Sequence, residues 1–178
     1  MRPALRLPPA RLLGLALLIL AACGPSMPET RPADFAVAYE WQAGSLPPPY
    51  HYAYTLVIGA DGAGVLTYVP DYDFNQPPVW TETFTVEAAD LDRLYALLVE
   101  TGVLRANWSA VADPPVGGEV ESAQLTVDGR TYAIPFAVAP VDHSRVQAAY
   151  AAIRALAPPA LWEKLAARRQ AYMDEHPE

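Results

Sequence analysis

The chain has 178 residues and carries 20 acidic against 12 basic side chains, for a formal net charge of −8. This length suits one compact domain, and an acidic surface repels the phosphates of nucleic acids, so we expect no nucleic-acid partner. The single cysteine, Cys23, excludes an intramolecular disulfide and a metal site built from several cysteines.

The first 22 residues have the organisation of a secretory signal peptide. Arg2, Arg6 and Arg11 form a positive flank, and residues 12–20 are uncharged and largely apolar. A membrane-spanning helix needs about 20 apolar residues, so this run is too short to be one. We therefore expect residues 1–22 to be removed after export.

A short motif follows the apolar run, with the sequence Leu20-Ala21-Ala22-Cys23-Gly24. It resembles the lipobox of bacterial lipoproteins, in which a leucine and two small residues precede an invariant cysteine. The resemblance implies cleavage before Cys23 and a diacylglyceryl group on its thiol. The alternative is an ordinary secreted protein whose cysteine lies near its cleavage site by chance.

The lipid would decide where the protein resides. Two or three acyl chains, such as palmitate, hold a protein firmly at a bilayer. The expected location is therefore a bacterial membrane, at the cell surface or the periplasmic face. Residues 23–33 are rich in proline and poor in apolar side chains, which predicts an extended tether before a single domain at 34–178.

The first half of the domain has the patterns of β-strands. Apolar residues alternate with others in 35–41 and 50–58, and three prolines at 47–49 separate the two segments. A glycine-rich turn then leads into a returning strand at 65–69. After a loop with several prolines, alternation resumes in 79–86, where β-branched residues favour a strand.

A second hairpin is predicted from Asp128-Gly129, a dipeptide that favours tight turns between strands. It lies between alternating segments at 121–127 and 131–138. The apolar residues that would face inward are Ala123, Leu125, Val127, Tyr132, Ile134 and Phe136.

Three segments have helical periodicity. Apolar residues recur at three and four positions in 88–101, and Gly102 follows where helices often end in a left-handed residue. A second helix is predicted at 144–156 and a third at 160–173, separated by two prolines that can open the third.

This order of elements predicts an α+β fold. We expect one twisted antiparallel sheet of about five to six strands, with about three helices packed mainly on one face and the other face partly in water. Strands and helices do not alternate as in right-handed βαβ units, which excludes a doubly wound nucleotide-binding fold.

An acidic segment has part of the spacing of a calcium-binding loop. Asp71, Asp73, Asn75 and Glu82 occupy the first, third, fifth and twelfth positions. The sixth position, however, is Gln76 where such a loop needs glycine for its sharp turn, and two prolines follow. We interpret the segment as a solvated acidic loop and expect no metal.

No pattern of a catalytic centre is present. The histidines His51, His143 and His176 lack metal-binding spacing. Asp142 and Ser144 flank His143, but adjacent side chains diverge, and either flanking residue is suited to cap the following helix. We therefore expect neither enzymatic activity nor a cofactor.

Aromatic residues crowd the first strands and the loops between them. Alternation should place about half of them in the core, but tyrosine and tryptophan are also enriched at binding surfaces. Our hypothesis is that the proline-bracketed loops at 46–50 and 71–80 rim a recognition surface. Its candidate residues are Tyr50, His51, Tyr72 and Trp80.

The whole pattern resembles families of uncharacterised bacterial lipoproteins. The segments that carry the resemblance are FTVE at 84–87, LDRLYALL at 91–98, VDGRTY at 127–132 and IRALAP at 153–158. The resemblance implies an α+β domain and no known activity.

Three functional classes follow from these observations. The first is a membrane-anchored binding or scaffold domain with an envelope protein or polymer as partner. The second is an inhibitor or accessory domain of a secreted enzyme, and the third is an envelope hydrolase. The sequence predicts no oligomeric state.

Overall fold

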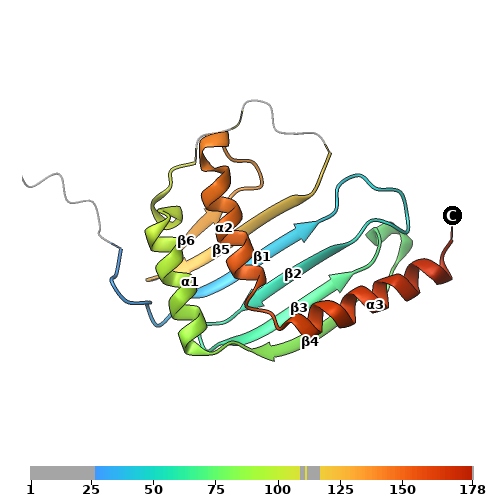
Figure 1. Cartoon of the computed structure of the whole chain (residues 1–178), viewed down its shortest axis with the longest axis horizontal. Helices are drawn as coiled ribbons and strands as arrows, with labels where there is room; N and C mark the ends of the chain where they lie inside the picture. The colour runs from blue at the N-terminus through green and yellow to red at the C-terminus, as the bar shows by residue number, and fades with distance from the viewer. Residues whose placement is uncertain (1–26, 109–110, 112–116, 178) are drawn as a thin grey trace, which may run out of the picture.

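The computed structural model describes residues 27–108, 111 and 117–177. Within this part of the chain, six strands form one antiparallel sheet and three α-helices lie over one face of it (Figure 1). The predicted α+β fold is thus confirmed. The elements are β1 (Ala36–Gln42), β2 (Ala53–Ile58), β3 (Ala63–Val69), β4 (Trp80–Thr85), α1 (Ala88–Glu100), β5 (Val120–Val127), β6 (Arg130–Ile134), α2 (His143–Arg154) and α3 (Pro159–Glu175).

The first strand of the chain lies in the middle of the sheet. The strand order is β4-β3-β2-β1-β5-β6, and all neighbours are antiparallel. The first four strands form a meander, after which α1 returns the chain to the free edge of β1. The ends of β1 and β3 and the starts of β2 and β5 therefore meet at one end of the sheet (Figure 1).

The turn between β5 and β6 has the geometry that its sequence predicts. Asp128 and Gly129 both have positive φ, 51° and 70°, as a tight hairpin turn of the primed type requires. The Asp34 carboxylate accepts hydrogen bonds from the backbone N–H groups of Gly129 and Asp128 at 2.6 and 2.9 Å. These bonds, that of Gly129 first, lower the pKa of Asp34. They also tie the entry of β1 to the tip of the second hairpin.

Alternate residues of each strand face the helices and form the core. Among the fully buried side chains are Leu56, Ile58, Leu66 and Leu125, and each stabilises the fold by about 1.5–3 kcal/mol. The helices bury Leu91, Leu94, Tyr95 and Leu98 of α1, Val146, Ala149, Tyr150 and Ile153 of α2, and Leu165 and Tyr172 of α3.

The opposite face of the sheet is free of helices and nearly free of charge. Thr55, Thr67 and Thr81 are cross-strand neighbours on it. Within the six described strands, Glu40 is the one ionisable side chain whose position in the alternation places it on this face.

Two strands are shorter than their apolar patterns predict, each for a local reason. Residues 47–50 form a turn in which Tyr50 N–H donates to the Pro47 carbonyl at 2.9 Å, so β2 begins only at Ala53. Pro135 has no N–H to continue the ladder, and β6 ends at Ile134. Phe136, expected to face inward, is consequently 58% exposed.

The residues that precede β1 pack along α1. Tyr95 donates a hydrogen bond to the Pro28 carbonyl at 2.8 Å, and Arg31 pairs with Asp92 at 2.6 Å. This segment lies at the end of the sheet opposite the loop between β1 and β2 (Figure 1).

The predicted signal peptide and Cys23 lie outside the described residues, so cleavage and lipidation stay predictions. Among the described helices, none is long and apolar enough to cross a bilayer.

Candidate binding site

The two proline-bracketed loops lie side by side at one end of the sheet. Residues 43–52 connect β1 to β2, and residues 70–79 connect β3 to β4. The Tyr72 hydroxyl bridges them by donating to the Leu46 carbonyl at 2.8 Å. We call these two loops together the loop platform.

A buried carboxylate gives the second loop its shape. The side chain of Asp71 accepts hydrogen bonds from the Tyr72 N–H and the Asn75 amide, both at 2.7 Å. The Tyr172 hydroxyl of α3 lies 3.4 Å from the same carboxylate. Because a buried charge needs such partners, Asp71 holds the loop in one conformation.

Three rings form a stack that leads from the interior of the platform to its surface. His51 and Tyr72 lie face to face with centroids 3.8 Å apart, and Phe74 continues the stack at 5.1 Å from Tyr72. His51 is 8% exposed, whereas Phe74 is 73% exposed. The outermost ring is therefore presented to solvent on a fixed base.

Exposed apolar side chains are concentrated on this platform. Of the eight large exposed hydrophobic residues in the described chain, four lie on its two loops, namely Leu46, Tyr50, Phe74 and Val79. Beside them is a hollow of about 570 Å³, lined in part by Pro48, Pro49, Asn75, Gln76, Pro77 and Tyr172. Such clustering on a monomer marks interaction surfaces.

The last turns of α3 support the platform from behind. Arg169 donates to the Tyr50 carbonyl at 2.9 Å, and its guanidinium lies 4.2 Å from the centre of the Tyr52 ring. Together with the Tyr172–Asp71 contact, this fixes both loops to one rigid helix.

The four residues expected at the recognition surface are not all on the loop platform. Tyr50 and Tyr72 lie on the platform, and His51 lies beneath Tyr72. Trp80 is instead buried at the start of β4, stacked on Tyr68 at 5.6 Å and covered by Arg168 at 4.5 Å.

Trp80 belongs to an aromatic row that crosses four strands. Trp41, Tyr54, Tyr68 and Trp80 are successive cross-strand neighbours, and their rings stack. Trp162 of α3 covers the row edge-on, 5.0 Å from Tyr54. Burial raises the pKa of Tyr54 to about 12. This half of the aromatic residues is therefore core, not surface.

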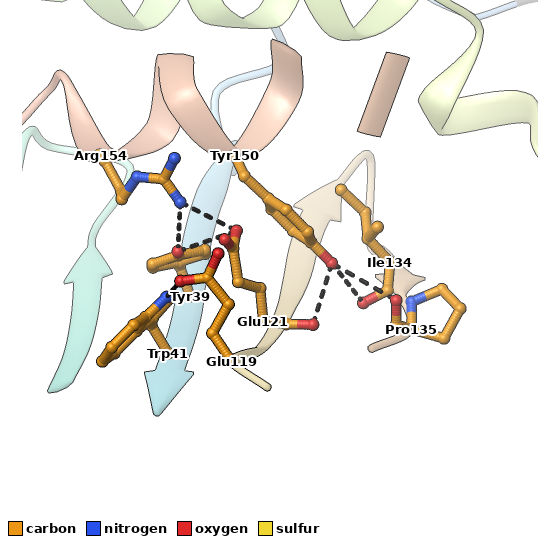
Figure 2. A network of polar contacts seen from close by, with 8 residues as sticks. All are labelled: Tyr39, Trp41, Glu119, Glu121, Ile134, Pro135, Tyr150 and Arg154. Carbon is orange, nitrogen blue, oxygen red and sulfur yellow. Dashed lines mark hydrogen bonds and ion pairs between the residues drawn. The ribbon is translucent and has the colours of Figure 1, made fainter. Parts of the chain in front are cut away.

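A polar network ties α2 to the sheet (Figure 2). One Glu121 oxygen accepts hydrogen bonds from the Tyr39 hydroxyl at 3.1 Å and from Arg154 at 2.9 Å, and Arg154 also contacts the Tyr39 hydroxyl at 2.8 Å. Burial raises the pKa of Tyr39 far above its usual range. For Arg154, burial lowers the pKa, but the bond to Tyr39 and neighbouring charges outweigh it, and the net pKa is raised. The Glu121 charge is thus neutralised within the fold.

The residues considered for catalysis do not converge. Asp142 pairs with Arg145 at 2.6 Å and makes no capping bond to α2, while Ser144 lies exposed on the helix. A ring nitrogen of His143 lies 2.9 Å from the Val138 carbonyl. This geometry positions no nucleophile beside a base.

The acidic residues of the calcium-like segment also have structural partners. Asp71 is bonded within its own loop, and Glu82 pairs with Lys164 at 2.7 Å and Arg168 at 3.5 Å. Across the described residues, no group of three or more His, Cys, Asp or Glu side chains is placed to hold a metal ion.

No family model matches the chain, and no curated protein is significantly similar to it.

Proposed function

We propose that this protein is a lipid-anchored binding domain of the bacterial envelope whose loop platform holds a protein or polymer partner. The observation that carries the proposal is the gathering of exposed apolar side chains on two loops that are tied to each other and to α3. A surface already held in shape loses little conformational entropy on binding. The platform therefore favours recognition over catalysis.

Inhibition of a secreted enzyme is the second candidate function. The Phe74 ring protrudes from a loop fixed by Asp71 and Tyr72. A rigid loop with a protruding apolar side chain is suited to enter a partner's cleft. A stoichiometric complex with a secreted enzyme, lost when Phe74 is replaced, would distinguish this function from a scaffold.

Lipidation of Cys23 is tested by metabolic labelling with palmitate in a bacterial host. We expect the wild-type chain to incorporate label and to sediment with membranes, and Cys23→Ser to lose both properties, because serine offers no thiol for the thioether. Unlabelled wild-type protein, or unchanged membrane retention of Cys23→Ser, would contradict the anchor and leave an exported acidic domain.

The platform is tested by affinity capture from membranes with the lipid intact. Replacing both Tyr50 and Phe74 by alanine should reduce recovery of the partner at least about tenfold, since each aromatic anchor at an interface contributes on the order of 1–2 kcal/mol. Both side chains are exposed, so the fold should be retained.

The matched control is Val141→Ala, which removes an apolar side chain that is exposed at another place. Partners that the control retains and the double variant loses support the platform. Equal recovery with both variants would overturn it.

A further inference from the structure

A second hollow, which the proposed function does not use, lies between α2, the start of β5 and the segment that follows β6. Its volume is about 440 Å³, within the range of small-molecule sites. Its walls are largely apolar and include Pro135, Phe136, Val138 and Val146. We call it the α2 cleft.

Two carboxylates line this otherwise apolar cleft. Glu121 is 7% exposed, and its Oε2 holds Tyr39 and Arg154. Within the described part of the chain, its Oε1 accepts no hydrogen bond. Glu119, exposed, lines the cleft too and accepts a bond from the Trp41 indole at 3.1 Å (Figure 2).

The charge balance of the cleft favours a cationic ligand. Glu119 and Glu121 line the cleft together with the His143 ring, which lies 2.9 Å from the Val138 carbonyl. Arg154, outside this lining, pairs with Glu121, which leaves the Glu119 carboxylate as the negative charge in excess. Ionised carboxylates only accept hydrogen bonds, and an ammonium group only donates them. The net charge of −8 adds a long-range attraction for cations.

We propose that the α2 cleft binds a protonated organic amine with a compact apolar body. The ammonium group lies between Glu119 and the free oxygen of Glu121, and the apolar body lies against Phe136, Val138 and Val146. The half-exposed Phe136 ring at the rim can also contact the cation through its face. This site is separate from the loop platform and does not depend on its proposed role.

The ligand class is tested with three probes of one shape, namely benzylamine, benzyl alcohol and benzoate. Benzylamine titrated into the ¹⁵N-labelled protein should shift the amide signals of residues 119–121, 136–138 and 143–150. Benzyl alcohol has no positive charge to pair with the carboxylates, so it should bind about tenfold more weakly than benzylamine. Benzoate, which is negatively charged, should bind more weakly still. Equal affinity for benzylamine and benzyl alcohol would overturn the cationic assignment.

Two isosteric variants locate the charge. Glu119→Gln keeps an oxygen for the Trp41 hydrogen bond, and it should weaken the binding of benzylamine about fivefold or more, since it removes the negative charge that Arg154 does not neutralise. Glu40→Gln neutralises an exposed carboxylate on the opposite face of the sheet and should change nothing. Shifts scattered over the surface, or equal affinities of both variants, would show that benzylamine does not bind in the α2 cleft.

Discussion

Replacing Gly62 by alanine should lower the free energy of unfolding by about 3 kcal/mol. Gly62 has a φ of 83°, where a residue with a Cβ is strained by about 1–2 kcal/mol. The added Cβ would also lie 2.4 Å from the Val86 carbonyl oxygen. The backbone cannot easily yield, because the Val86 N–H donates to the Gly62 carbonyl at 2.9 Å, and overpacking of this kind costs about 1–3 kcal/mol.

The matched control is Gly129→Ala in the other hairpin. Gly129 has a similar φ of 70°, but no atom lies within 4 Å of the added Cβ. Only the backbone strain applies, so we expect a loss of about 1 kcal/mol. Urea unfolding of both variants measures the difference. Equal losses would show that the turn and the end of β4 do not approach so closely.

Replacing Arg154 by methionine should have the second large effect, a loss of about 2–3 kcal/mol. The change leaves the buried Glu121 carboxylate without its cation, and breaking a buried ion pair on one side typically costs about 3–5 kcal/mol. The expected value is smaller because the Arg154 side chain is 30% exposed.

A double-mutant cycle in urea measures the interaction. Adding Glu121→Gln to Arg154→Met removes the unpaired charge, so the double variant should be more stable than Arg154→Met alone. If the stability loss of the double variant equals the sum of the losses of the two single variants, the ion pair does not couple α2 to the sheet.

Local periodicity was sufficient to predict most elements of the fold but not their order. Local sequence was enough to predict the Asp128-Gly129 turn and the left-handed Gly102, because both depend on the backbone preferences of these residues and not on distant contacts. The addition of β5 to β1 rather than to β4 depends on packing between distant segments. The ends of β2 and β6 were misplaced because an apolar pattern continued through a turn and through Pro135.

The amino-acid composition predicted which loops form the candidate site, but it did not predict which of their side chains are buried. Prolines and aromatic residues located the loops and, with them, Tyr50 and Tyr72. Trp80 was misplaced because it opens a strand, and its alternation with Phe84 puts it on the helix-covered face. Phe74 was missed, although an apolar residue among aspartates and prolines, outside any periodic segment, is itself a signal.

The polar network had no signal in the sequence. Arg154 is 33 residues from Glu121 and 115 from Tyr39, and only the folded sheet brings the three together. The α2 cleft, which shares Glu121 with this network, could not be predicted for the same reason.

The packing of the N-terminal segment against α1 fixes the end of the sheet at which the chain enters the domain. This segment and the loop platform lie at opposite ends of the central strand, whose seven residues span roughly 23 Å. A fatty anchor on Cys23 would attach the domain to the bilayer on the side of this segment, with the loop platform at the opposite end of the sheet. Any molecule captured there would be held clear of the bilayer and displayed toward the surrounding medium.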